Sequence, residues 1–399
     1  MTPDARRILA LQALRAFAYG LGSVLIGVTL ARKGLSGFEV GLVLAALLAG
    51  VAVTSIAIAR TADQVGRRRW YVALFLLMGL AGTAFALTDE TWLLVVAALS
   101  GTISTEVVES GPFTSLEQAM LPSAVGTGGD PTRLFGTYNT VATLAGSAGA
   151  LAAALVPALG VEPQRLLLVY VAVGVVGAVV ARGLSETLEP ARRSHAAPLQ
   201  RSRGIVQRLS ALFALDSFGG GFVTQAFIAY WFTETFGTSL EVLGVVFFVL
   251  GLLQSVSFQV ATRLAARFGL LNTMVFTHLP SNVLLAAIPF APTEAAAFAL
   301  LLARALLSQM DVPTRQSFVM AVVPPEERSA AAGVTSVART VGASISPVFA
   351  GMLFAHPALI NVPFFIAGVL KIGYDLSLYR AFASVQPPEE VAFRDPIQR

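Results

Sequence analysis

The sequence predicts an all-α membrane protein made of two similar halves of six helices each. Composition is the first indication, since 55% of the residues are hydrophobic, only 13% are charged and the mean hydropathy is +0.74. A soluble protein has about 25% charged residues, so this chain is suited to lipid rather than water. The second indication is a series of twelve apolar runs, each long enough to span a bilayer as a helix. The third is an internal repeat with an offset of about 200 residues.

The apolar runs fall into two groups of six. The first group lies at 8–31, 37–60, 70–88, 92–121, 132–157 and 164–184, and the second at 206–233, 239–263, 270–291, 294–322, 329–354 and 361–384. One long polar segment separates the groups. We therefore expect an N-terminal bundle over 1–184, a cytoplasmic linker over 185–203, a C-terminal bundle over 204–384 and a cytoplasmic tail over 385–399.

The distribution of arginine sets the expected orientation. Most arginines lie in the tails, in the linker or in the turns on the same side as these segments. Because cytoplasmic loops carry an excess of basic residues, both termini and the linker are predicted to be cytoplasmic. The run at 8–31 is too long for the apolar core of a signal peptide and has no obvious cleavage site, so we expect it to be retained.

The two halves share several positions. Glu39 near the start of the second run parallels Glu241 near the start of the eighth. Further parallel pairs are Arg15 and Asp216, Gly66 and Gly269, Pro112 and Pro313, and Gly146 and Gly342. Both halves begin on the same side of the membrane, which predicts a parallel repeat.

The loop after the second run has a distinctive order of residues, Ala59-Arg-Thr-Ala-Asp63-Gln-Val-Gly66-Arg67-Arg68-Arg69. It resembles the loop between helices 2 and 3 of the major facilitator superfamily of transporters, although the family's leading glycine is replaced by Ala59. With the topology and the repeat, the resemblance extends over nearly the whole chain. It implies the superfamily fold, a bacterial efflux-type transporter, and two bundles that rock about a central site lined by helices 1, 4, 7 and 10.

Charged residues within the apolar runs are the candidate functional residues, because a charge in the bilayer is costly and usually faces a bundle interior. Two groups recur at helical spacing, and the prolines Pro112 and Pro313 should bend the helices that hold them. One group is Glu106, Glu109, Phe113 and Glu117, and the other is Arg304, Leu307, Asp311 and Arg315. The expected substrate- or proton-binding residues are Arg15, Glu106, Glu109, Asp216, Arg304, Asp311 and Arg339.

A structural alternative applies to some of these charges. Asp311 and Arg315 are four residues apart, as are Lys371 and Asp375, so each pair could lie along its own helix without any role in transport. The sequence indicates no role for the polar tract His278-Leu-Pro280-Ser-Asn282.

A gate on the cytoplasmic side follows from the resemblance. In the family the loop acid lies against the amino end of helix 11, which carries a partial positive charge, when the cavity faces outward. That residue is Asp63 here, with Gly66 forming the turn and Arg67 nearby. Glu117 and Arg315 lie lower in helices 4 and 10 and are expected to serve the same gate.

Several classes of function are disfavoured. The chain has no cysteine and three widely separated histidines, so we expect no metal and no thiol chemistry. There is no His-Glu-x-x-His or Gly-x-Ser-x-Gly motif and no nucleotide-binding loop, so we expect neither an enzyme, nor a cofactor, nor ATP drive. The net charge of +4 is explained by membrane topology and does not require nucleic acid.

The expected function is therefore secondary transport by alternating access, with proton-coupled export of a small organic solute or drug as the preferred form. The first alternative is a uniporter or importer of a polar or anionic metabolite, and a non-transporting receptor or scaffold is a further one. Expected partners are the solute, protons and lipid, and the protein is expected to be monomeric. Its abundance of alanine and arginine is typical of a bacterial gene of high GC content, which favours the bacterial cytoplasmic membrane.

Overall fold

The computed structural model describes residues 1–32, 34–104, 111–124, 131–189, 199–324 and 327–384, and within these ranges every regular element is helical. Ten of its helical segments are long and apolar enough to cross a membrane. They are 3–32, 37–62, 67–87, 163–182, 203–236, 240–268, 270–290, 294–321, 330–354 and 357–382. The two other expected spans correspond to α4 (Thr91–Ala98) with α5 (Gly111–Ala124), and to α6 (Pro131–Ala154). The all-α membrane fold is confirmed.

Contacts divide the chain into two compact units, which we describe separately. The first comprises 1–193, 223–252 and 347–360, and the second 194–222, 253–346 and 361–399. The predicted boundary at the 185–203 linker stays an expectation.

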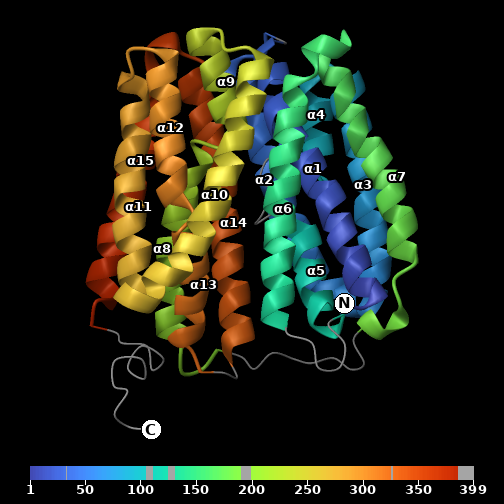
Figure 1. Ribbon diagram of the computed structural model, residues 1–399, viewed down its shortest axis with the longest axis vertical. Coiled ribbons are helices and arrows are strands. Elements are labelled where there is room, and N and C mark those ends of the chain that lie inside the picture. The colour runs from blue at the N-terminus through green and yellow to red at the C-terminus, as the bar shows by residue number, and fades with distance from the viewer. Residues whose placement is uncertain (33, 105–110, 125–130, 190–198, 325–326, 385–399) are drawn as a thin grey trace. The chain divides into compact units, whose positions relative to one another are not determined.

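The first unit is organised around α1 (Pro3–Arg32). This helix packs against α6 and α9 (Gln225–Phe236), and Figure 1 shows α1 beside α6. Glycine permits the approach, because a Cβ on Gly20 would lie 1.8 Å from the carbonyl oxygen of Gly146. α2 (Gly37–Val65) contacts α4 and α5, and α3 (Arg67–Leu87) packs along α7 (Val169–Arg182).

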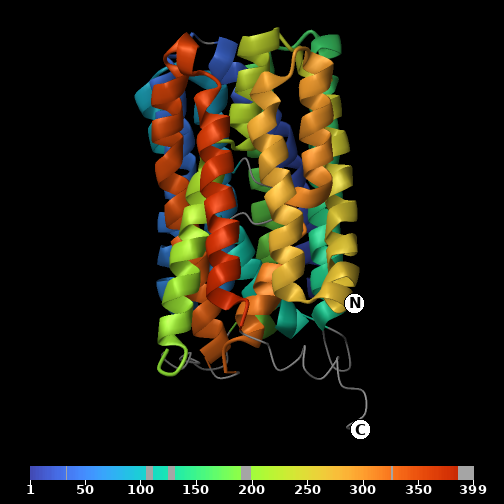
Figure 2. The same cartoon turned by 90° about the vertical axis from the view of Figure 1, so that its left-hand side faces the viewer.

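The second unit is organised around α8 (Arg203–Gly221), α11 (Leu270–Ala287) and α15 (Val362–Phe382). α15 packs against both of the others, and Figure 2 shows α8 and α15 side by side. α11 also contacts α12 (Glu294–Ser308) and α13 (Asp311–Ala321). Phe213, Met274, Phe318, Tyr374 and Phe382 are buried together in an apolar cluster at one end of these helices.

Two long helices pass from one unit to the other. α10 (Leu240–Phe268) enters the second unit after Leu252, and α14 (Arg328–Phe354) enters the first unit at Pro347. Within the first unit Gly41 of α2 lies against Gly351 of α14, where a Cβ would come within 2.5 Å of the Gly351 Cα.

The repeat predicted from Gly66 and Gly269 appears in the backbone. Gly66 has φ 105° between α2 and α3, and Gly269 has φ 86° between α10 and α11. A side chain is strained at such angles, so glycine makes both turns. The corresponding turns of the two halves therefore have similar backbone conformations, each with a glycine at positive φ.

Three expected helices are broken rather than continuous. The expected helix 92–121 is wrong as a single element, because α4 ends at Ala98 and α5 begins at Gly111, which has φ 60°. Pro112 lies in the first turn of α5, and Pro313 likewise lies in the first turn of α13, after a break that follows Ser308. Proline lacks an amide hydrogen and suits the first turn of a helix, so these prolines start helices instead of bending them.

The third break interrupts the expected helix 206–233. It follows Gly219-Gly220-Gly221, where α8 ends, and α9 begins after the N-cap residue Thr224. Glycine weakens a helix interior, and the Thr224 hydroxyl accepts a hydrogen bond from the Phe227 amide, which favours a new start.

Carboxylates hold the amino ends of two helices. Glu189 accepts hydrogen bonds from the amides of Arg67 and Arg68 at 2.8 and 3.0 Å, where α3 begins. Glu327 accepts from the amides of Gln200 and Arg201, both at 3.0 Å, and from the amide and hydroxyl of Ser202, the N-cap of α8. The hydroxyl of Ser202, followed by these amides, lowers the pKa of Glu327 to about 2.

Candidate functional site

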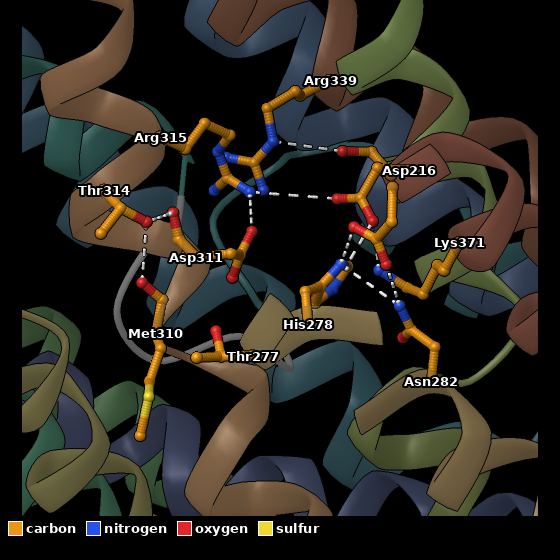
Figure 3. Close-up of polar contacts among 12 residues, drawn as sticks. Asp216, Thr277, His278, Asn282, Met310, Asp311, Thr314, Arg315, Arg339 and Lys371 are labelled. Atoms are coloured by element: carbon orange, nitrogen blue, oxygen red, sulfur yellow. Dashed lines mark hydrogen bonds and ion pairs between the residues drawn. The ribbon is translucent and has the colours of Figure 1, made fainter. Parts of the chain in front are cut away.

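The second unit contains a buried cluster of charged and polar side chains from four helices (Figure 3). Its members are Asp216 from α8, His278 and Asn282 from α11, Asp311 and Arg315 from α13, and Lys371 and Asp375 from α15. Each of these residues is buried. Charges removed from solvent must be paired to persist, so the contacts among them define the cluster.

Asp216 lies close to three basic side chains. Its Oδ1 lies 2.6 Å from Nζ of Lys371 and 3.9 Å from Nε2 of His278. Its Oδ2 lies 3.9 Å from Nη1 of Arg315. One carboxylate thereby meets groups from three other helices, and its Oδ1 is close to both a lysine and a histidine.

His278 lies between two carboxylates. Its Nδ1 is 2.9 Å from Oδ1 of Asp375, on the side of the ring opposite the Asp216 contact. Asn282 donates to the other oxygen of Asp375 at 3.0 Å. The ring of Tyr374 packs edge-on against the imidazole, with the centroids 6.0 Å apart.

Two arginines make further contacts in and beside the cluster. Arg315 donates to Asp311 at 2.5 Å along α13, which confirms the pairing along one helix that the spacing allowed. Arg339 of α14, which is labelled in Figure 3, is half-buried and donates from Nε to the hydroxyl of Ser217 at 3.2 Å. Arg339 therefore lies beside the residue that follows Asp216.

The cluster corrects one expectation and adds two residues. Lys371 and Asp375 do not pair with each other along their helix, because Lys371 bonds Asp216 and Asp375 bonds His278 and Asn282. His278 and Asn282 had no predicted role. A histidine and an asparagine four residues apart in an apolar run share one helix face, which is the signal that could have indicated them.

The first unit contains a second buried cluster, centred on Arg15. Its Nη2 lies 2.6 Å from Oε2 of Glu117, and both side chains are fully buried. Gln12 also accepts a hydrogen bond from Arg15. Tyr71 donates to Oε1 of Glu117 at 2.5 Å, and Tyr138 donates to Oε2.

Aromatic rings complete the surroundings of Arg15. The guanidinium carbon lies 5.3 Å from the ring centroid of Tyr19 and 5.0 Å from that of Phe113. Both distances are within the range of cation–π attraction. Arg15 and Glu117 thus form a fully buried ion pair between α1 and α5, surrounded by aromatic rings and hydrogen-bonded to Gln12 and two tyrosine hydroxyls.

The other predicted site residues either are not fully described or do not belong to the two clusters. Glu106 and Glu109 lie outside the described residues, and the side chain of Asp63 is not described either. Arg304 is half-buried in α12, before the break, so it does not share a continuous helix with Asp311 and Arg315. Arg67 follows the Gly66 turn and donates to the carbonyl of Ala119 at 2.9 Å.

Ion pairs buried within an apolar helical assembly are typical of secondary transporters, which move solutes through paths lined by such groups. Within the described ranges, no His, Asp and Glu side chains group in a way that could hold a metal ion. The fold and the two clusters thus define a multi-pass membrane protein of the transporter class.

The particular family follows from comparison with known proteins. The model of the Major Facilitator Superfamily matches residues 8–347, with a second match over 209–397. The chain belongs to this superfamily, whose members are transporters rather than enzymes.

Individual relatives support this assignment. The chain is 25% identical over 425 residues to a Saccharomyces cerevisiae protein described as "Uncharacterized membrane protein YJR124C", a match that covers 96% of this chain and 94% of that one. A mutant of the nucleoside transporter NupG has a TM-score of 0.78 at 13% identity, covering 95% of this chain and 99% of that one. The structure of a bacterial homolog of the human lysosomal transporter Spinster, in an inward-facing and occupied conformation, has a TM-score of 0.74 at 14% identity. This match covers 95% of this chain and 96% of that one. These two structures share the fold.

Proposed function

We propose that this protein is a proton-coupled secondary transporter that works by alternating access and exports a small organic solute. The observation that supports the coupling is the position of His278 between the carboxylates of Asp375 and Asp216. Histidine is the side chain whose charge changes most readily near neutral pH, so it is the natural proton carrier of such a cluster.

The hydrogen bonds indicate which nitrogen would receive the proton. With Asp375 ionised, its two oxygens accept from the Asn282 amide and from Nδ1 of His278. The neutral imidazole then carries its hydrogen on Nδ1 and its lone pair on Nε2. Since Nε2 lies 3.9 Å from Oδ1 of Asp216, proton uptake there creates a cation beside a second carboxylate.

Proton uptake would change the partners of Asp216. Its Oδ1 is already bonded by Lys371 at 2.6 Å, so a protonated His278 competes with Lys371 for the same oxygen. The three residues belong to α8, α11 and α15, and a change of partner alters how these helices are held together. A proton that binds one arrangement better than the other shifts the balance between two conformations, as alternating access requires.

We assign the other roles as proposals. Arg15, Glu106, Glu109, Arg304 and Arg339, with Asp216 and Asp311, are the proposed substrate- and proton-binding residues, and Asp63, Gly66, Arg67, Glu117 and Arg315 the proposed cytoplasmic gate. We also propose a monomer in the bacterial cytoplasmic membrane with both termini inside, because the basic residues favour that orientation.

The test is a proton-flux assay on the purified full-length protein in liposomes that contain a pH-sensitive dye. A panel of solutes is added, beginning with nucleosides because NupG is a nucleoside transporter. We expect at least one solute to move protons in wild-type liposomes. Opposite movement of solute and proton supports export by antiport, and movement in the same direction supports proton-linked import.

Matched histidine variants locate the coupling. His278→Asn should abolish solute-dependent proton movement while solute exchange at equal pH persists. His356→Asn, at an exposed residue, should leave both intact. Solute flux without proton movement in the wild type would favour the uniporter alternative, and full coupling in His278→Asn would place the proton site elsewhere.

A further inference from the structure

The first unit has an open hollow of about 310 Å³ where α3 begins and α7 ends. It is lined by Arg68, Arg69, Val72 and Arg182. None of the three arginines forms an ion pair within the described part of the chain. Three like charges around one small hollow repel each other, so the site is suited to an anion.

The nearby carboxylate of Glu189 accepts hydrogen bonds from the backbone amides of Arg67 and Arg68, and within the described residues it forms no ion pair with the three guanidinium groups that line the hollow. Arg68 donates from Nη1 to the carbonyl of Leu184 at 3.1 Å, which anchors that guanidinium at the hollow. In the described part of the chain no hydrogen bond or ion pair uses the side chains of Arg69 and Arg182, so their N–H groups are available to a ligand. A guanidinium offers paired donors that match a phosphate group.

Apolar side chains continue from the hollow along both helices. On α3, Leu76 and Leu80 follow Val72 at intervals of four and are 45% and 68% exposed. On α7, Val179 and Val175 precede Arg182 at helical spacing and are 62% and 55% exposed. Residues at these spacings share one face of a helix, so each helix presents an outward apolar stripe that ends at an arginine.

The helix pair that carries the stripes is tightly packed. A Cβ on Gly174 of α7 would lie 2.6 Å from the carbonyl oxygen of Phe75 of α3, and one on Gly177 would lie 2.2 Å from the Phe75 ring. The two helices can therefore hold the arginines at a fixed separation.

We propose that the hollow binds the headgroup phosphate of an anionic phospholipid, with its acyl chains lying along the two apolar stripes. The hollow lies at the ends of two membrane-spanning segments, 67–87 and 163–182, which is where a headgroup would be found. The basic residues predict this end to be cytoplasmic, and that leaflet carries anionic lipid. The apolar stripes favour a lipid over a free phosphate, and the site is independent of proton coupling.

The test uses the full-length protein in detergent, with phosphatidylglycerol or phosphatidylcholine added and retained lipid counted by native mass spectrometry. We expect the wild type to retain phosphatidylglycerol in preference to phosphatidylcholine. Arg69→Gln with Arg182→Gln should weaken retention by about fivefold for each arginine removed. The control is Arg263→Gln with Arg267→Gln, which removes the same charge from exposed positions of α10 and should leave the preference unchanged.

Further arms decide between lipid and other anions. Glycerol phosphate or inorganic phosphate should not displace the lipid, and equal competition would overturn the assignment to a lipid. If both double variants lose the same amount of retained phosphatidylglycerol, the preference reflects general surface charge, and the proposed lipid site is overturned. A photoreactive phosphatidylglycerol should label the wild type within 68–80 and 175–182, which tests the site even if the double variant does not fold. Labelling only elsewhere would contradict the proposal.

Discussion

Arg15 of α1 and Glu117 of α5 form an ion pair at 2.6 Å in which both side chains are fully buried. In the second unit Asp216 of α8 lies 3.9 Å from Arg315 of α13, with the signs of charge reversed. The internal repeat aligns Arg15 with Asp216, and both pairs join the first expected helix of a half to the fourth. The two halves therefore use the same connection with opposite polarity.

The first prediction concerns the pair in the first unit. Arg15→Met should leave Glu117 as an uncompensated buried carboxylate, because among the described residues its remaining partners are the hydroxyls of Tyr71 and Tyr138. Removing one partner of a buried pair costs about 3–5 kcal/mol. We expect a large fall in the thermal unfolding temperature of the purified protein in detergent.

The double variant Arg15→Met with Glu117→Met is the control. It removes both charges and should unfold at a higher temperature than Arg15→Met alone, since no unpaired charge is left. Glu117→Met completes the comparison. If the loss of stability in the double variant equals the sum of the losses in Arg15→Met and Glu117→Met, the pair has no coupling energy.

The second prediction concerns the tautomer of His278. The chain has three histidines, so nitrogen NMR of histidine-labelled protein gives few signals, which single His→Asn variants assign. We expect neutral His278 to carry its hydrogen on Nδ1, because Asp375 accepts there at 2.9 Å. Asp375→Asn should mix the two tautomers, whereas Asp216→Asn should preserve the Nδ1–H form. A hydrogen on Nε2 in the wild type would contradict the proposed site of proton uptake.

The third prediction concerns the pH dependence of Glu327, which is outside the membrane spans. Hydrogen bonds from Ser202 and the neighbouring amides lower its pKa from 4.5 to about 2. The folded state thus favours the ionised form, so its stabilising effect is full above pH 4.5 and is lost as the pH falls through about 2.

Glu327→Gln should therefore lower the unfolding temperature at pH 7, and the difference from wild type should shrink between pH 4.5 and pH 2. Glu186→Gln, at an exposed position, should change little at either pH. Differential scanning fluorimetry across this range provides the comparison. A difference that stays constant to the lowest pH would indicate that ionisation of Glu327 has no part in its effect.

The fourth prediction concerns the contact of α1 with α6. Gly20→Ala should destabilise the protein strongly, because the new Cβ would lie 1.8 Å from the carbonyl oxygen of Gly146 and the backbones would have to separate. Overpacking a tight contact costs about 1–3 kcal/mol or more. Size-exclusion profiles and unfolding temperatures in detergent report the loss.

Gly333→Ala is the matched control, because nothing lies within 4 Å of a Cβ there and Gly333 is helical. Alanine is favoured over glycine in a helix, so this change should be neutral or slightly stabilising. Equal behaviour of the two alanine variants would mean that α1 and α6 can separate at little cost.

The sequence by itself determined the class of this protein, because a helix that spans lipid needs a long apolar run. The polar linker and the basic turns mark where these runs end and which side of the membrane the turns lie on. The sequence also identified Gly66 and Gly269 as equivalent turns, because positive φ selects glycine locally. It also identified the candidate charges Arg15, Asp216 and Asp311, because a charged residue inside an apolar run is recognisable without knowledge of its partner.

Only the tertiary structure decided how those charges are paired. Spacing along one helix suggested Lys371 with Asp375, yet Lys371 bonds Asp216, 155 residues away, and Asp375 bonds His278, 97 residues away. The structure also decided that Pro112 and Pro313 start helices. The pairing of the charges could not be predicted because a buried charge takes the partner that packing brings nearest. Packing between helices far apart in sequence leaves no periodic pattern in the chain.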